Sequence, residues 1–146
     1  MIHLVIQGKP LGKQRVKQGA MKGGHATLYT PMQTVNWEVL VKLMFMDKYP
    51  KWIPWESGVA LNVSVHAYYP VAASKSLKIK AQMLSGRIRP TVKPDFDNVA
   101  KIACDALNQI AYADDCQIVD ADQHKYYSDQ PRVEMWIRKM SSISDL

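Results

Sequence analysis

Apolar and polar residues follow one another along this chain in short blocks whose periods predict four strands. Residues 1–7 are mostly apolar and β-branched, and in residues 59–69 the odd positions are apolar while most even positions are polar. A period of two places the apolar side chains of a strand on one face. Residues 117–127 and 132–138 predict two more strands, and the turn at residues 128–131 predicts that these two form a hairpin.

Three other segments carry helical patterns. Thr30 as N-cap and Pro31 in the first turn predict a helix that runs to about Lys48. Its expected buried stripe is Met32, Val35, Val39, Leu43 and Met46, widened by Trp37 and Leu40. A short basic helix is expected over residues 74–84. A third helix is expected over residues 98–112, capped by Asp97 or Asn98, with the stripe Val99, Ile102, Ala103, Ala106, Leu107 and Ile110.

These elements predict the fold class. We expect one α+β domain over residues 1–140, with a mixed sheet of about four strands packed on one face by helices 31–48 and 98–112. A chain of 146 residues is long enough for one hydrophobic core. Residues 141–146 are expected to be a disordered tail.

Composition narrows the protein class. Hydrophobic residues make up 47% and charged residues 22% of the chain, as in ordinary globular domains. The apolar runs are too short to predict a membrane span, and residues 1–7 lack the features of a signal peptide. The two cysteines, Cys104 and Cys116, form no disulfide framework. We therefore expect a cytoplasmic protein with reduced thiols and no membrane partner.

The net charge of +6 conceals an asymmetry along the chain. Up to Lys93 there are 14 Lys and Arg residues against three acids, whereas from Pro94 onward there are five against ten. A basic body with a local acidic cluster fits a protein that attracts phosphates and holds a metal ion. The alternative is that this charge has no such role, because many basic proteins never bind nucleic acid.

The richest candidate chemistry lies between Lys93 and Ile118. Asp95 and Asp97 are two residues apart, so in an extended segment their carboxylates face the same way. Lys101 follows one helical turn later, and Asp114 and Asp115 come after the expected helix. The later acids join the earlier ones only if the chain folds back, for example as a strand beside one that ends at Asp95.

Several carboxylates without His or Cys suit a hard cation such as Mg²⁺ or Mn²⁺. Beside a lysine, such an ion can polarise a phosphodiester and activate water, while the lysine offsets charge in the transition state. The simpler alternative is that Asp95 and Asp97 only cap a helix and that Asp114 and Asp115 form a solvated turn.

The order of these residues resembles the signature of the RusA family of Holliday junction resolvases. The matching pieces are Asp95-Phe96-Asp97-Asn98, Lys101, Asp105-Ala106-Leu107 and Asp114-Asp115-Cys116-Gln117-Ile118. The run from Gly8 to Arg15 and the triplet Tyr29-Thr30-Pro31 also resemble this family. The likeness is sharp from Pro94 to about Asp120.

The resemblance implies a homodimeric, magnesium-dependent endonuclease that makes paired nicks in four-way DNA junctions, with Mn²⁺ as a substitute ion. It implies Asp95, Asp97 and Asp115 as metal-binding catalytic acids and Lys101 as the essential lysine. The stretch between helix and Asp-Asp pair is one residue shorter than in some members, so the choice between Asp115 and Asp114 stays open.

Two basic segments are candidates for contacts with DNA phosphates. The glycine-dotted loop at residues 9–28 carries Lys9, Lys13, Arg15 and Lys17, and the segment before Asp95 carries Arg87, Arg89 and Lys93. Each of these cations is also compatible with a solvated loop. Asp120 is a second-rank candidate ligand beside Asp122, although the polar face of an edge strand explains both. His66 is either a general base or a half-buried polar residue.

Three functions remain open from the sequence. The first is a junction-resolving endonuclease in DNA recombination and repair. The second is a metal-dependent nuclease for other branched or single-stranded DNA, and the third is a DNA-binding module without catalysis.

Overall fold

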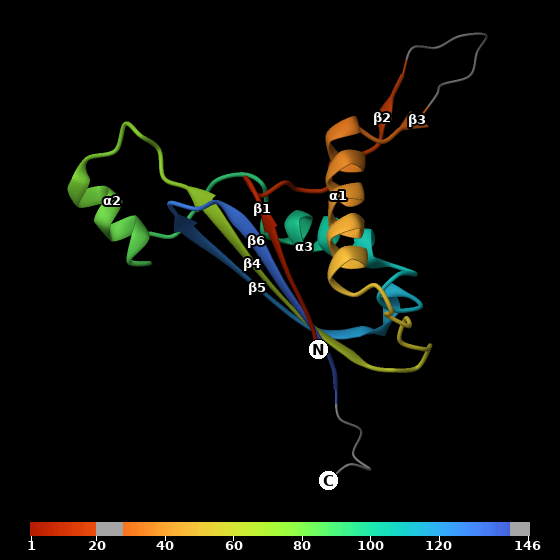
Figure 1. Ribbon diagram of the computed structural model, residues 1–146. Helices are drawn as coiled ribbons and strands as arrows, with labels where there is room; N and C mark the ends of the chain where they lie inside the picture. Colours follow the sequence, from red (N-terminus) through yellow and green to blue (C-terminus); the bar gives the residue numbers. More distant parts are fainter. Residues whose placement is uncertain (20–27, 141–146) are drawn as a thin grey trace.

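The computed structural model describes residues 1–19 and 28–140, which form three α-helices, a four-stranded mixed sheet and a separate two-stranded sheet (Figure 1). The strands are β1 (Ile2–Gln7), β2 (Lys17–Gln18), β3 (Leu28–Tyr29), β4 (Leu61–Pro70), β5 (Ile118–Ser128) and β6 (Arg132–Lys139). The helices are α1 (Met32–Lys48), α2 (Leu77–Leu84), α3 (Phe96–Leu107) and the short 3-10 helix η1 (Asp115–Gln117). The predicted α+β class is confirmed, and the expected tail at 141–146 lies outside the described residues.

The order of strands in the main sheet is β1-β6-β4-β5. β4 pairs in parallel with β5 and antiparallel with β6, and β1 pairs antiparallel with β6. The predicted hairpin between residues 117–127 and 132–138 is therefore wrong, because β4 lies between these two strands. The sheet places the two strands with strict apolar alternation, β4 and β6, in its centre and the more polar β5 at its edge.

The hydrophobic core lies between one face of this sheet and the helices α1 and α3, as expected. Odd-numbered residues of β4 and β6, from Leu61 to Tyr69 and from Val133 to Ile137, are buried there. They meet Val41 and Phe45 of α1 and the predicted stripe of α3, of which Val99 and Leu107 are fully buried. The helix α2 lies apart from α1, beside the opposite end of the sheet, with Ser76 as its N-cap (Figure 1).

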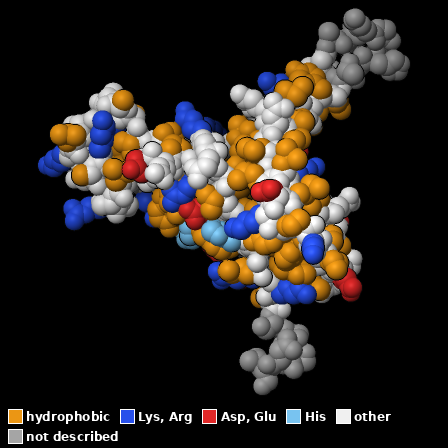
Figure 2. Space-filling model, in the orientation of Figure 1, with side chains coloured by type: hydrophobic (Ala, Val, Ile, Leu, Met, Phe, Trp, Pro, Cys, Tyr) orange, Lys and Arg blue, Asp and Glu red, His pale blue; other side chains and the backbone are white. Residues whose placement is uncertain are grey.

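The helix α1 faces the core with a different side from the one predicted. Its buried residues are Thr34, Val41 and Phe45. The predicted stripe of Met32, Val35, Val39, Leu40, Leu43 and Met46 is exposed, with Leu43 at 59%. Figure 2 shows hydrophobic side chains along the visible surface of this helix. The periodicity identified a real apolar face, but Val41 and Phe45 on another side meet the core; of the predicted residues, Trp37 packs against that core.

The boundaries of two helices also differ from the predictions. Pro31, not Thr30, occupies the N-cap position of α1, and Asp95, not Asp97 or Asn98, occupies that of α3. The helix α3 ends at Leu107 instead of residue 112, because Asn108 leaves helical geometry and Gln109 has a φ of 62°. The chain then turns so that Ala111 and Tyr112 still reach the core.

The aromatic connector after α1 is structural. Tyr49, Trp52 and Trp55 form a chain of edge contacts with Phe45, with ring centroids 5.0–5.9 Å apart. The Trp52 indole N–H donates to the carbonyl of Ala111 at 3.0 Å. No helix in residues 1–19 and 28–140 has the length and apolar content needed to span a bilayer.

Candidate active site

Asp95 stands where a loop ends and α3 begins, and its carboxylate is not used as a helix cap. It accepts no capping hydrogen bond from the described residues. Instead its Oδ2 atom pairs with the ammonium of Lys93 at 2.5 Å, and 48% of the Asp95 side chain is exposed. The preceding segment is a loop rather than the extended strand considered from the sequence. Because both side chains are exposed, a cation can replace the ammonium of Lys93 at this carboxylate.

The turn that presents Asp95 is held by β4 and β5. The hydroxyl of Tyr69 donates to the carbonyl of Pro94 at 2.9 Å. The ammonium of Lys125 donates to the carbonyls of Val92 and Pro94 at 2.5 and 3.1 Å. Burial, together with the charge of Asp95, raises the pKa of Tyr69 to about 12, so its hydroxyl stays a donor at neutral pH. The sheet therefore fixes the backbone next to Asp95.

The N-terminal loop packs against the same turn. The backbone N–H of Lys13 donates to the carbonyl of Asn98 in α3 at 2.9 Å. A Cβ atom at Gly12 would lie only 2.7 Å from the Cβ of Pro94, so this close approach requires glycine. A cavity of about 400 Å³ between the loop and the turn is lined by Lys9, Lys13 and Asp95, among others. The basic loop and the first acid thus share one surface.

Lys13, predicted to contact DNA, is engaged inside the protein. Its ammonium forms ion pairs with Glu38 of α1 and with Asp105 of α3, the latter at 3.0 Å. Burial lowers the pKa of Lys13, but hydrogen bonds to the two carboxylates outweigh this and raise it overall. This lysine ties the N-terminal loop to both core helices.

Asp97 and Lys101 line a pocket between α3 and the inner face of β4 and β5. Together with Cys104 they occupy one stripe of α3 at spacings of four and three residues. The pocket has a volume of about 500 Å³ and is also lined by Gln123. Both polar atoms of the Gln123 amide are buried and find no partner among the described residues. An orphaned amide beside a carboxylate and a lysine fits a site for a hydrated cation or a phosphate.

Asp114 and Asp115 have different surroundings. The carboxylate of Asp114 accepts a hydrogen bond from the backbone N–H of Cys116 at 2.9 Å and completes a capping box with Gln117. These hydrogen bonds lower the pKa of Asp114. Asp115 begins η1 and lies near the C-terminal half of α3, where its charge adds to the burial that raises the pKa of Cys104. Asp115 therefore faces the far end of the stripe that begins at Asp97.

The acids are not gathered into a closed cage. In the part of the chain that the structure describes, the one set of three potential ligand side chains within 4.8 Å of one another is His66, Asp122 and His124. Asp97 and Cys104 are separated by about 10 Å along the axis of α3, given a rise of ~1.5 Å per residue. Among the described residues, Asp95, Asp97 and Asp115 therefore do not form such a set.

The remaining candidates are distributed over the surface. Lys9, Arg15, Lys17 and Arg87 are exposed. Arg89 stacks on the ring of Tyr126, 3.9 Å from its centroid, and donates to the carbonyl of Lys125. Asp120 accepts a hydrogen bond from Asn62 at 3.1 Å. Lys125 and Gln123 were missed from the sequence, since single residues of an edge strand carry no motif.

The sequence of this chain is similar to those of known proteins. Residues 7–138 match the family described as endodeoxyribonuclease RusA. The chain belongs to the RusA endodeoxyribonuclease family. It is also 35% identical over 141 residues to the "uncharacterized protein YqaN" of Bacillus subtilis (strain 168), an alignment that covers 97% of this chain and 98% of that protein. The family supports a nuclease that acts on DNA and suggests a divalent metal ion.

Proposed function

We propose that this RusA-family protein is a magnesium-dependent endonuclease that resolves four-way DNA junctions by paired symmetric nicks, in recombination and repair. The observation that carries the proposal is the family match over residues 7–138, which includes the whole segment from Asp95 to Asp115. The exposed Asp95 and the pocket shared by Asp97 and Lys101 give this segment a surface that a DNA strand can reach.

Asp95 and Asp97 are the proposed primary ligands of Mg²⁺, for which Mn²⁺ can substitute. Magnesium is usually held by one or two carboxylates, several waters and substrate phosphates rather than by a complete protein cage. An open pair of acids therefore fits this ion better than it fits zinc. When bound, the ion supplies Lewis-acid polarisation of the phosphodiester and a water molecule of lowered pKa.

Asp115 is the proposed third acid, in preference to Asp114. Asp114 already accepts the backbone hydrogen bond that begins η1, whereas the charge of Asp115 acts on Cys104, which lines the same pocket as Asp97 and Lys101. Lys101, between the two groups of acids, is proposed to neutralise charge on the phosphate in the transition state. Gln123 is proposed to donate to the bound phosphate or a water, which gives its buried amide a partner.

The decisive experiment compares cleavage of a synthetic four-way junction by wild type, Asp95→Asn and Lys101→Ala, each with and without Mg²⁺. Asp95→Asn keeps the shape of the side chain and removes the ligand charge, so we expect junction binding to persist and cleavage to be lost. Asp129→Asn, an exposed aspartate in the turn before β6, is the matched control and is expected to cut normally. Wild-type rates in Asp95→Asn would exclude the proposed metal role.

Substrate choice separates the open alternatives. Preferential cleavage of forks or single strands would assign the protein to other branched DNA. Absence of Mg²⁺-dependent cleavage on four-way, forked and linear DNA, with binding intact, would leave a non-catalytic DNA-binding module. Lys101→Ala should lose rate while its thermal unfolding stays unchanged; loss of folding would instead make this lysine structural.

The exposed cations are proposed to hold DNA phosphates. Because Lys13 and Arg89 are engaged within the protein, the sharper test uses Arg15→Ala with Lys17→Ala. Removing two phosphate contacts should weaken binding and reduce the slope of log affinity against log salt by about 2. The paired control is Lys51→Ala with Lys139→Ala, two exposed lysines away from β2 and β3. If both double variants show the same slope of log affinity against log salt, the loop that carries Arg15 and Lys17 does not contact DNA phosphates.

Symmetric nicking calls for two active sites, and we propose a homodimer with two-fold symmetry. The exposed apolar stripe of α1 is the surface that suits this contact, since a second copy presents the same stripe in a self-complementary way. Val39→Glu with Leu43→Glu should yield monomers in light scattering, while Gln130→Glu, an exposed residue in the turn before β6 and outside α1, should not. A wild type that is monomeric at micromolar concentration, with or without junction DNA, would contradict the dimer.

A further inference from the structure

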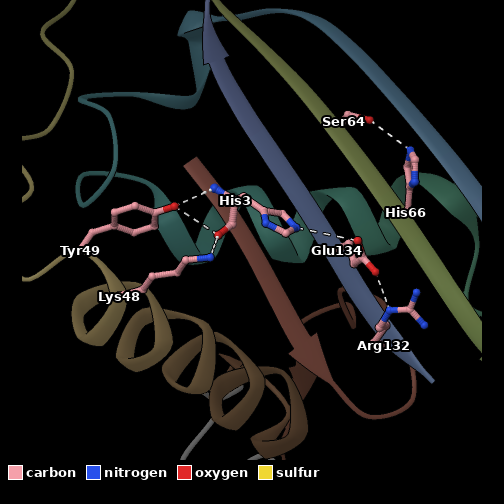
Figure 3. Close-up of polar contacts among 7 residues, drawn as sticks. All are labelled: His3, Lys48, Tyr49, Ser64, His66, Arg132 and Glu134. Atoms are coloured by element: carbon pink, nitrogen blue, oxygen red, sulfur yellow. Dashed lines mark hydrogen bonds and ion pairs between the residues drawn. The ribbon is translucent and has the colours of Figure 1, made fainter. Parts of the chain in front are cut away.

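The sheet has an open face, defined as the side that carries the even-numbered side chains of β4 and β5. On this face the parallel register sets Ser64 beside Asp122 and His66 beside His124. Figure 3 shows Ser64 and His66 on β4, with Glu134 on the neighbouring strand β6. The two pairs come from segments that are 58 residues apart in sequence, so only the fold brings them together.

The geometry of this group is that of a metal-ligand set. One potential ligand atom each from His66, Asp122 and His124 lies within 4.8 Å of the others. The Nε2 atom of His124 is 3.2 Å from the Oδ2 atom of Asp122. Two donors that bind one tetrahedral zinc ion at ~2.1 Å are about 3.4 Å apart, so a pair at the 4.8 Å limit needs to close by about 1.4 Å.

The neighbouring serine orients the carboxylate as outer groups do in metal sites. The hydroxyl of Ser64 donates to Oδ2 of Asp122 at 2.6 Å and lies 3.3 Å from Nε2 of His66. The rings of His66 and His124 stand nearly perpendicular, at 84°, with centroids 4.9 Å apart. About half of the Asp122 and His124 side chains is exposed, which leaves room for water as a further ligand.

We propose that His66, Asp122 and His124 form a second metal site, selective for a transition ion such as Zn²⁺ and separate from the magnesium acids. Two imidazoles and one carboxylate suit zinc, cobalt or nickel, whereas Mg²⁺ avoids nitrogen ligands. The bound ion fastens the edge strand β5 to the central strand β4. Because β5 also carries Gln123 on its inner face, the ion stabilises the wall of the pocket that contains Asp97 and Lys101.

The test is calorimetric titration of the full chain with ZnCl₂, in buffer free of chelators and of Mg²⁺. We expect one saturable zinc site per chain and a rise in the melting temperature on binding. Asp122→Asn and His124→Ala should each weaken binding by more than about tenfold, and Ser64→Ala by about tenfold through misorientation of the carboxylate. Co²⁺ should report the same site by its visible absorption spectrum.

The matched control is Asp120→Asn, the same change two residues away on the same face of β5, which should leave the zinc affinity unchanged. Asp95→Asn should bind zinc normally even if it cannot cut DNA, which separates this proposal from the nuclease function. Melting without metal checks that each variant is folded. The inference is overturned if wild type has no saturable zinc site, or if zinc affinity is unchanged in both Asp122→Asn and His124→Ala.

Discussion

Two glutamines with buried amide groups, Gln117 and Gln123, should respond in opposite directions to the same substitution. The amide of Gln117 is fully engaged: it donates to the carbonyls of Glu56 and Val59 at 2.8 and 3.0 Å and accepts from the N–H of Asp114 at 3.0 Å. The amide of Gln123 is buried without a partner among the described residues. Replacement of each by leucine, which is similar in size, isolates this difference.

The sign of each change in unfolding free energy depends on which polar groups lose a hydrogen-bond partner when leucine replaces glutamine. Gln117→Leu leaves the N–H of Asp114 and the carbonyl of Val59 without this partner, whereas the carbonyl of Glu56 still accepts from the N–H of Val59. Unmade hydrogen bonds of this kind cost about 1–3 kcal/mol each where water is excluded. Some of these groups regain water, so we expect a loss of about 2–4 kcal/mol in the free energy of unfolding. Gln123→Leu removes an unsatisfied amide and adds apolar burial, so we expect a gain of about 1–2 kcal/mol.

Urea unfolding followed by circular dichroism measures both values, and junction cleavage measures their functional counterpart. The stabilised Gln123→Leu variant should cut more slowly, because the amide is available only for a bound phosphate or water. If Gln123→Leu lowers stability as Gln117→Leu does, the amide already has a partner in the folded protein and its proposed role fails. If Gln123→Leu is more stable than wild type but cuts at the same rate, the amide has no role in cleavage.

Two further predictions follow from the surroundings of Lys13 and of the cysteines. Lys13→Met should lower the free energy of unfolding in urea by about 1–2 kcal/mol, because Glu38 and Asp105 lose their partly exposed cation. The pKa of Lys13 is raised above 10.5, so this difference in stability from wild type should be complete at pH 8. It should shrink as the pH rises through the pKa of Lys13. In native protein at pH 8, a thiol reagent should label the exposed Cys116 but not Cys104. Burial raises the pKa of Cys104 to about 12, so its thiol stays protonated and unreactive. Rapid labelling of both cysteines would contradict this prediction.

The sequence predicted elements well where one face of an element is covered by the core. The alternation in β4 and the stripe of α3 state directly which side is buried, and both were confirmed. The resemblance to the RusA family, now confirmed over residues 7–138, came from the order of acids around α3. The roles of Asp95, Asp97, Lys101 and Asp115 stay predictions.

The errors arose where a pattern has two physical solutions. The helix α1 has an exposed apolar stripe and, on another side, the buried residues Val41 and Phe45. Periodicity alone cannot tell which of two apolar sides packs against the sheet. Likewise, two strands joined by a short turn favour a hairpin, but in the structure β6 pairs with the apolar β4 and β1, not with β5. The group around His66 was invisible because its members meet only through this parallel pairing.

A single β-bulge in the pairing of β4 with β5 determines which side chains of β5 point to the core and which point to the open face. Leu61 pairs with Ile118, but Asn62 pairs with Asp120, so Val119 is an extra residue in β5 and its side chain is 63% exposed. Without this bulge, Asp120, Asp122 and His124 would point into the core and Gln123 away from it, because a shift of one residue exchanges the two faces of a strand. The bulge thus directs Gln123 to the pocket of Asp97 and Lys101, and directs Asp122 and His124 to the open face, beside His66 of β4.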